Sequence, residues 1–313
     1  MTAFLVTGAA GFIGSNLAEG LVERGHRVVG VDNFLTGKRA NLEWPGSGSM
    51  TFVEADIRDR DRMASLMDGI DFVLHHAALA SVPWSVEDPV LANDHNVNGT
   101  LSVLLAARDA RVKKVVMACT SAVYGNTDRL PAREDQPLEC LSPYAATKLM
   151  GEHYLALFRR VWGLATVGLR YFNVYGARQD PTSAYAAAIP IFASRILAGE
   201  RSTIFGDGEQ TRDFIHVDDV VEANLGACEA GDEASGQVFN IGGGKRVTVN
   251  ELFSLIARLL GGEAAVDHGP ERPGDARHSV ADISKAARVL GFEPSLDLEA
   301  GLARAVGWYR ENL

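Results

Sequence analysis

A glycine-rich turn near the start of the chain constrains the fold more than any other feature of the sequence. Gly8, Gly11 and Gly14 occur in the segment TGAAGFIG, which follows a short apolar run and opens a helical pattern from Phe12 to Arg24. Glycine lets the backbone turn tightly and approach a pyrophosphate, and the free N–H groups at the start of a helix attract an anion. A strand, a glycine turn and a helix in this order predict a dinucleotide site at the edge of a parallel sheet. Cofactor contacts are expected from Gly8, Gly11, Phe12, Ile13 and Gly14.

Short apolar runs alternate with longer helical patterns along much of the chain, and this alternation predicts an α/β fold. The runs lack a polar–apolar alternation, as strands do when helices cover both faces of their sheet. We therefore predict a doubly wound, Rossmann-type parallel sheet. The predicted strands are Phe4–Thr7, Arg27–Asp32, Thr51–Glu54, Phe72–His75, Lys114–Ala118, Ala165–Arg170 and Val238–Ile241.

The rhythm changes after about residue 176, where prolines and a short glycine turn interrupt the pattern. We assign residues 1–176 to a dinucleotide-binding domain and residues 177–313 mainly to a smaller, discontinuous α/β domain for the substrate. The stretch from about 214 to 243 could instead return to the sheet. Asn250–Leu260 and Val280–Leu290 are predicted as helices, because their apolar residues recur with a helical period.

The composition limits the partners and the compartment. The 313 residues carry a net charge of −10, which argues against a general nucleic-acid binder, because such a protein needs a basic face. The three cysteines are sparse and lack C-x-x-C spacing, as expected in a reducing compartment. No apolar run approaches the ~20 residues that span a bilayer, so we expect a cytoplasmic protein. The adjacent His75 and His76 would point to opposite faces of a strand, so no metal site is predicted.

The pair Tyr144 and Lys148, in the segment SPYAATK, indicates what is done with the dinucleotide. A phenol has a pKa near ~10, too high for a base at neutral pH. A lysine one helical turn away favours the phenolate and should lower that pKa. Thr120 follows a predicted strand at the sheet edge where ligands bind, and its hydroxyl could hydrogen-bond the same substrate oxygen. These residues predict proton removal from a hydroxyl group while a nicotinamide accepts a hydride from the same carbon.

Asp32 indicates which dinucleotide is bound. It ends the second predicted strand in VVGVDN, near the offset expected of the acid that binds the adenosine ribose. A carboxylate there accepts hydrogen bonds from a 2′-hydroxyl and would repel a 2′-phosphate, so NAD is predicted rather than NADP. Asp56 and Ile57 follow the third predicted strand and are expected to meet the adenine.

Four segments together resemble the extended short-chain dehydrogenase/reductases and, within them, the UDP-hexose 4-epimerases. They are TGAAGFIG, ACTSAVYG from Ala118, YAATK from Tyr144 and YFNVYG from Tyr171. Further segments, such as SVPWSVEDP from Ser81 and NVNGT from Asn96, are similar to the subgroup that acts on UDP-N-acetylhexosamines. The resemblance covers nearly the whole chain. It implies NAD as cofactor, a UDP-sugar as substrate, epimerisation at C4 through a transient 4-keto sugar, and a homodimer.

The resemblance also implies roles for single residues. Tyr144 would be the base, Thr120 a second hydroxyl at the substrate oxygen, and Lys148 the ribose-binding lysine. Asn173 would hold the phosphates, and Arg212 and Arg272 would pair with the diphosphate, where guanidinium geometry suits phosphate oxygens. The remaining candidate cofactor contacts are Asn33, Ala77, Asn96 and Tyr171, and the remaining candidate substrate contacts are Ser81, Val82, Ala187, Ile204, Phe205, Asp275 and Ser279.

Two positions depart from bacterial epimerases restricted to UDP-glucose and UDP-galactose. Those enzymes often have a lysine where Ala80 stands and a bulky tyrosine where Ser279 stands. A serine at position 279 should enlarge the sugar pocket and leave room for a 2-acetamido group.

The sequence also bears on four alternative functions. The 4,6-dehydratases and UDP-glucuronate decarboxylases carry an acid just after the active-site hydroxyl, whereas Ser121 and Ala122 follow Thr120 here. UDP-glucuronate 4-epimerase stays open, because its machinery would look the same. A non-catalytic, NAD-sensing regulator predicts a degraded Tyr–Lys pair, yet both residues are intact.

Overall fold

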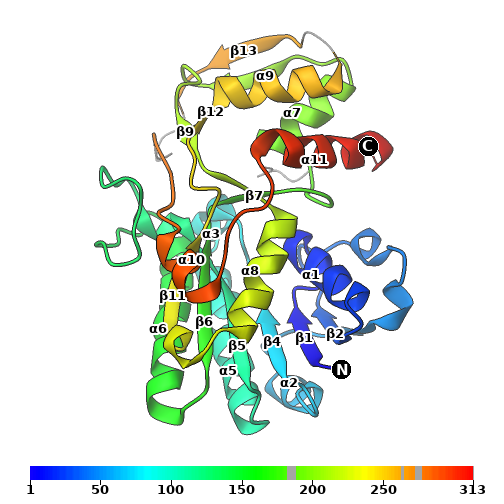
Figure 1. Ribbon diagram of the computed structural model, residues 1–313, viewed down its shortest axis with the longest axis vertical. Coiled ribbons are helices and arrows are strands. Elements are labelled where there is room, and N and C mark those ends of the chain that lie inside the picture. The colour runs from blue at the N-terminus through cyan, green and yellow to red at the C-terminus, as the bar shows by residue number, and fades with distance from the viewer. Residues whose placement is uncertain (182–187, 262–263, 272–276, 313) are drawn as a thin grey trace.

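The centre of the protein is a seven-stranded parallel sheet (Figure 1). The structure is a computed structural model that describes residues 1–181, 188–261, 264–271 and 277–312. The strands lie in the order β11-β6-β5-β4-β1-β2-β3. Each predicted strand corresponds to one of them, with ends that differ by at most two residues, so the predicted fold class is confirmed. The strands are β1 (Ala3–Thr7), β2 (Arg27–Asp32), β3 (Thr51–Glu54), β4 (Phe72–His75), β5 (Lys114–Thr120), β6 (Thr166–Tyr171) and β11 (Gln237–Ile241).

Helices cover both faces of this sheet, which is why its strands are apolar without alternation. One face packs against α1 (Phe12–Glu23), α8 (Val217–Glu229) and α10 (Ser284–Leu290). The other packs against α2 (Arg60–Leu66), α5 (Gly99–Asp109) and α6 (Pro143–Trp162). Strands β1, β5 and β6 are buried at every position.

The long helix α6 has clear start and stop signals in its sequence. The Ser142 side chain accepts a hydrogen bond from the Ala145 N–H at 3.2 Å, and Pro143 occupies the first helical position. Gly163 ends the helix in a left-handed conformation, with φ of 73°. The short helices α3 (Val82–Glu87) and α4 (Pro89–Asn93) pack beside it, followed by a π-helical turn over Asp94–Asn98. None of the described helices is long and apolar enough to cross a bilayer.

A smaller group of elements lies at the upper end of the molecule in Figure 1. Helices α7 (Ala188–Leu197), α9 (Val249–Leu260) and α11 (Leu298–Asn312) share a separate apolar core. The predicted helix Asn250–Leu260 is confirmed as α9, where Thr248 and Glu251 form a capping box. Short strand pairs complete the group and join it to the sheet: β8 (Ser202–Phe205) with β13 (Val266–Gly269), β9 (Thr211–Arg212) with β12 (Val247–Thr248), and β7 (Asn173–Tyr175) with β10 (Phe214–His216).

The predicted helix Val280–Leu290 was wrong over its first four residues, because α10 begins only at Ser284. Backbone hydrogen bonds hold the preceding segment extended: Ala132 N donates to Val280 O at 2.8 Å, and Asp282 N donates to Ala132 O at 2.9 Å. Pairing with a segment about 150 residues earlier in the chain therefore outweighs the helical period of the local sequence.

Candidate active site

The glycine turn forms a cradle at the start of α1. Gly8 has φ of 74°, a left-handed conformation that favours glycine. A Cβ atom at Gly14 would lie 2.0 Å from the Gly8 carbonyl oxygen, so only glycine fits there. Gly11 precedes α1 and offers no capping side chain, which leaves the N–H groups in the first turn of α1 available to an anion. Gly8, Gly11, Gly14, Phe12 and Ile13 line a cavity of about 350 Å³.

Asp32 lines the same cavity from the end of β2. Its carboxylate accepts hydrogen bonds from Ala10 N at 3.0 Å and Phe34 N at 2.8 Å. Burial raises the pKa of Asp32, and these backbone hydrogen bonds act in the opposite direction. The predicted cofactor residues Asn33, Ile57, Ala77 and Tyr171 line this cavity too.

Two predicted cofactor residues, Asp56 and Asn96, are not among the described residues that line this cavity. The Asp56 carboxylate pairs with the Arg58 guanidinium at 2.8 Å and accepts from Asn33 Nδ2 at 2.9 Å, and the hydrogen bond from Arg58 lowers its pKa. Asn96 is buried and bonds both backbone groups of Leu79, at 2.8 and 3.1 Å, and the Thr147 hydroxyl at 3.0 Å. Asn96 therefore ties the loop after β4 to helix α6.

Thr120, Tyr144 and Lys148 come together from two elements. Thr120 is the last residue of β5, while Tyr144 and Lys148 lie one turn apart on α6. The Tyr144 N–H donates to the Ser85 hydroxyl at 3.0 Å, which fixes the first turn of α6 against α3. Lys148 is buried, and its Nζ donates to the Ala118 carbonyl oxygen at 3.0 Å.

The effect of Lys148 on the Tyr144 pKa stays a prediction, and other influences on this pKa act in opposite directions. Burial raises the pKa of Tyr144, the hydrogen bond with the Thr120 hydroxyl lowers it, and Cys119 raises it. Burial also lowers the pKa of Lys148 to about 8. Thr120 is thus the side chain whose hydroxyl favours the phenolate, because a hydroxyl can donate to it.

A second cavity, of about 570 Å³, adjoins the first. Thr120, Tyr144, Tyr171 and Phe172 line both, so the reacting groups form a wall shared by the two cavities. Four predicted substrate residues line this second cavity besides Thr120 and Tyr144: Val82, Asn173, Arg212 and Ser279.

The other predicted substrate residues divide into two groups. Ser81, Ile204 and Phe205 are not among the described residues that line the second cavity: Ser81 caps α3, and Ile204 is buried in the core of the smaller group. Ala187, Arg272 and Asp275 lie outside the described residues.

Several lining residues were missed by the sequence analysis. Tyr124, Asn126 and Ser142 line the second cavity, as does His278, whose Nδ1 lies 3.0 Å from the Thr211 hydroxyl. The signal for them was their closeness in sequence to Thr120, Tyr144 and Ser279. His76 lines the first cavity, and its Nε2 lies 2.9 Å from the Tyr171 hydroxyl.

Both neighbouring histidines contact hydroxyl groups through their ring nitrogens. His75 lies between the hydroxyls of Thr7 and Thr100, at 2.7 and 2.9 Å, and burial lowers the pKa of His76 to about 3. Across the described parts of the chain, no group of three or more histidine, cysteine, aspartate or glutamate side chains could hold a metal ion.

The sequence profile of the NAD dependent epimerase/dehydratase family matches residues 4–242. The chain belongs to this family. Its cofactor is NAD, and the glycine cradle, the uncapped start of α1 and the carboxylate of Asp32 suit the pyrophosphate and adenosine ribose of that molecule.

Individual members of the family resemble the chain over its full length. It is 42% identical over 311 residues to a UDP-glucose 4-epimerase of Mycolicibacterium smegmatis, covering 98% of each chain. Among solved structures, a UDP-N-acetylglucosamine 4-epimerase of Methanobrevibacter ruminantium in complex with UDP-N-acetylmuramic acid has a TM-score of 0.95 at 40% identity, covering 100% of this chain and 99% of that chain. A UDP-glucose 4-epimerase of Thermus thermophilus in complex with NAD has a TM-score of 0.89 at 37% identity, covering 100% of both chains.

Proposed function

We propose that the protein is an NAD-dependent 4-epimerase of UDP-sugars, acting on UDP-GlcNAc and UDP-GalNAc and on UDP-glucose and UDP-galactose. The observation that carries this proposal is the wall formed by Thr120 and Tyr144 between two cavities. One cavity contains the dinucleotide cradle, and the other contains the cation Arg212 and the amide of Asn173. A hydroxyl carbon in the second cavity would therefore lie between a base and a hydride acceptor.

The proposed mechanism is a transient oxidation at C4 of the sugar. Tyr144 removes the proton of the C4 hydroxyl, and Thr120 hydrogen-bonds the same oxygen. NAD held in the first cavity would supply a hydride acceptor for C4 and a hydride donor to the other face of the sugar, so that none would be consumed overall. Arg212 and Asn173 hold the diphosphate while the 4-keto sugar turns over, and Tyr144 then returns the proton. Lys148 would hold the nicotinamide ribose.

The residues beside Thr120 argue against elimination chemistry. Ser121 and Ala122 line the second cavity directly after Thr120, and neither supplies the acid that a 4,6-dehydratase needs at this place. We also propose acceptance of N-acetylated sugars, because the small side chain of Ser279 lines the same cavity.

The test is a product assay with UDP-GlcNAc, UDP-glucose and UDP-glucuronate, each incubated without added NAD. We expect the C4 epimers of the first two to form, and formation of UDP-galacturonate alone would replace our substrate assignment by the uronate.

Tyr144→Phe should lose turnover by at least roughly 100-fold while keeping the fold and bound NAD, since one hydroxyl is removed. Tyr154→Phe, on the same helix, is the matched control. Near-normal turnover of Tyr144→Phe would contradict its role as the base.

A homodimer is proposed for the assembly. Val86, Val90 and Met150 are exposed apolar side chains on α3, α4 and α6, which pack together. A second copy covering them would remove this apolar surface from water. Sedimentation should give a dimer, and Val90→Glu should give a monomer.

The reducing cytoplasm is proposed as the compartment, in keeping with three cysteines that are free.

A further inference from the structure

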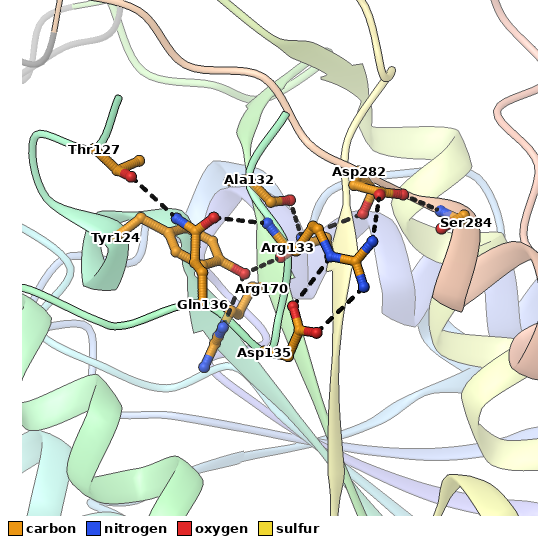
Figure 2. A network of polar contacts seen from close by, with 10 residues as sticks. Tyr124, Thr127, Ala132, Arg133, Asp135, Gln136, Arg170, Asp282 and Ser284 are labelled. Atoms are coloured by element: carbon orange, nitrogen blue, oxygen red, sulfur yellow. Dashed lines mark hydrogen bonds and ion pairs between the residues drawn. The ribbon is translucent and has the colours of Figure 1, made fainter. Parts of the chain in front are cut away.

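Tyr124 lines the second cavity and belongs to a buried polar network, of which Figure 2 shows the part around Tyr124 and Arg170. Arg170 on β6 forms two hydrogen bonds with Glu152 on α6, at 2.9 and 2.7 Å, and a third with the Tyr124 hydroxyl at 2.8 Å. The Tyr124 hydroxyl donates to Asn240 Oδ1 at 2.6 Å. Both charged residues of this network, Arg170 and Glu152, are at most 6% exposed, so their polar atoms depend on one another for partners.

The direction of each hydrogen bond in the network follows from its members. Arg170 can only donate, so the Tyr124 oxygen accepts from it. Burial raises the pKa of Tyr124 to about 12, so the phenol keeps its proton and donates it to Asn240. Asn240 Nδ2 then donates to Ala132 O at 2.8 Å and Asp282 O at 3.2 Å. The Tyr124 hydroxyl therefore has one donor, Arg170, and one acceptor, Asn240, and both are buried.

Tyr124 is connected to the reacting groups by a very short path. Residues Ser121–Tyr124 form a single 3₁₀ turn that begins directly after Thr120. The Thr120 hydroxyl accepts the Ala122 N–H at 3.2 Å, so its oxygen is held by this turn, and Thr120 lines both cavities together with Tyr144. Tyr124 ends the turn and also lines the second cavity. A shift of the turn would move the Thr120 hydroxyl away from Tyr144.

The network also reaches the other two parts of the site. Glu152 lies one helical turn beyond Lys148 on α6. At the opposite end, Asn240 holds the extended segment that contains Asp282, three residues after Ser279. Figure 2 shows Arg133 beside this segment, where it pairs with Asp135 at 3.1 Å and Asp282 at 4.0 Å. The hydroxyl of Tyr124 therefore lies between the elements that carry Thr120, Lys148 and Ser279.

We propose that Tyr124 is a positioning residue, whose hydroxyl holds the turn after β5 so that Thr120 can donate its hydrogen to Tyr144. Arg170 and Asn240 hold the Tyr124 hydroxyl in turn. The proposal rests on the proposed function only in that Tyr144 is taken as the base. Besides Tyr124, the titratable and charged groups that line the two cavities near Tyr144 include Cys119 on β5, Lys148 on α6, His76 after β4, Tyr171 on β6, Arg212 on β9 and His278. The Tyr124 hydroxyl hydrogen-bonds with Arg170 and Asn240 instead.

The test is Tyr124→Phe, which removes one oxygen and keeps the ring. We expect kcat to fall roughly tenfold to hundredfold, as for a reacting group slightly misplaced, with little change in KM for the UDP-sugar or in NAD content. The acidic limb of the kcat–pH profile should move upward by about 0.5 to 1 pH unit, because the phenolate of Tyr144 loses hydrogen-bond support. Tyr154→Phe is the matched control and should leave both kcat and the acidic limb of its pH profile unchanged.

A merely structural role would lower kcat or the melting temperature without moving the acidic limb, and that outcome overturns the proposal. Asn240→Ala provides a second variant, since it removes the acceptor of the Tyr124 hydroxyl and should move the limb in the same direction. If the wild type does not epimerise UDP-sugars, the proposed function fails by itself. The Tyr144 pKa can then be measured without substrate by ultraviolet titration, as the difference between a protein and the same protein carrying Tyr144→Phe. This difference is measured for the wild type and for Tyr124→Phe. Equal Tyr144 pKa values in the two would again overturn the proposal.

Discussion

At the scale of single residues, Asp213 shows how one buried carboxylate organises a binding surface. Its oxygens accept the N–H groups of Gly243, Gly244 and Ala281 at 2.7, 3.1 and 2.8 Å. Its carbonyl oxygen accepts both the backbone N–H of Asn173 and its side-chain amide, at 3.0 and 2.8 Å. Burial raises the pKa of Asp213 from 3.8 to about 6. A carboxyl group with a raised pKa stabilises the fold while protonated, and this contribution is lost as the pH rises through about 6.

The prediction is that Asp213→Asn, which cannot ionise, shows a pH-dependent stability difference from the wild type. Between pH ~4 and ~6.5 the wild type should lose up to about 3 kcal/mol of unfolding free energy relative to the variant. Urea unfolding at several pH values measures this. A difference that stays constant over the range would mean that the Asp213 carboxylate is ionised throughout.

At the scale of elements, the extended segment before α10 is the part of the molecule most suited to select the sugar. Ser279 donates its N–H to Thr211 O at 3.1 Å, and three residues later Asp282 is bonded to Ala132. Both ends of the segment are thus held by the backbone, so a larger side chain at 279 cannot easily be moved out of the cavity. Ser279→Tyr should lower kcat/KM for UDP-GlcNAc far more than for UDP-glucose, because the ring would clash with an acetamido group and not with a hydroxyl.

Steady-state kinetics on both substrates test this, with Ser49→Tyr in an exposed 3₁₀ turn as the control for the same substitution elsewhere. Equal losses for the two sugars would show that Ser279 does not select between them.

At the scale of the whole molecule, the cofactor cavity draws on strands and helices that lie far apart in the sequence. It is lined from Gly8 to Val174. A ligand that binds only the folded chain stabilises it by mass action, by about 2.7 kcal/mol at one hundred times its Kd. We therefore expect NAD to remain bound through purification and its removal to lower Tm by roughly 5 °C. Added NAD should restore Tm, while NADP should not, because Asp32 repels a 2′-phosphate. Equal rescue by NADP would contradict the role of Asp32.

The sequence alone determined the sheet and the cradle, because these depend on neighbouring residues. Apolar runs specify buried strands, and Gly8 and Gly14 permit a turn that no other residue fits. The sequence also indicated Tyr144 and Thr120, since a helical period and a strand end are local features. Fold class and family could therefore be predicted from the order of the amino acids.

Tertiary structure decided the contacts between residues far apart. Lys148 Nζ donates to Ala118 O, thirty residues away in the sequence, a partner that the local sequence did not indicate. The helical pattern at Val280 yields to pairing with Ala132, about 150 residues earlier in the chain. Tyr124 meets Asn240 across 116 positions, and no local pattern reports such a pair. The physical reason is that a buried polar group takes whichever partner the packed elements bring within about 3 Å, and only the packing specifies that partner.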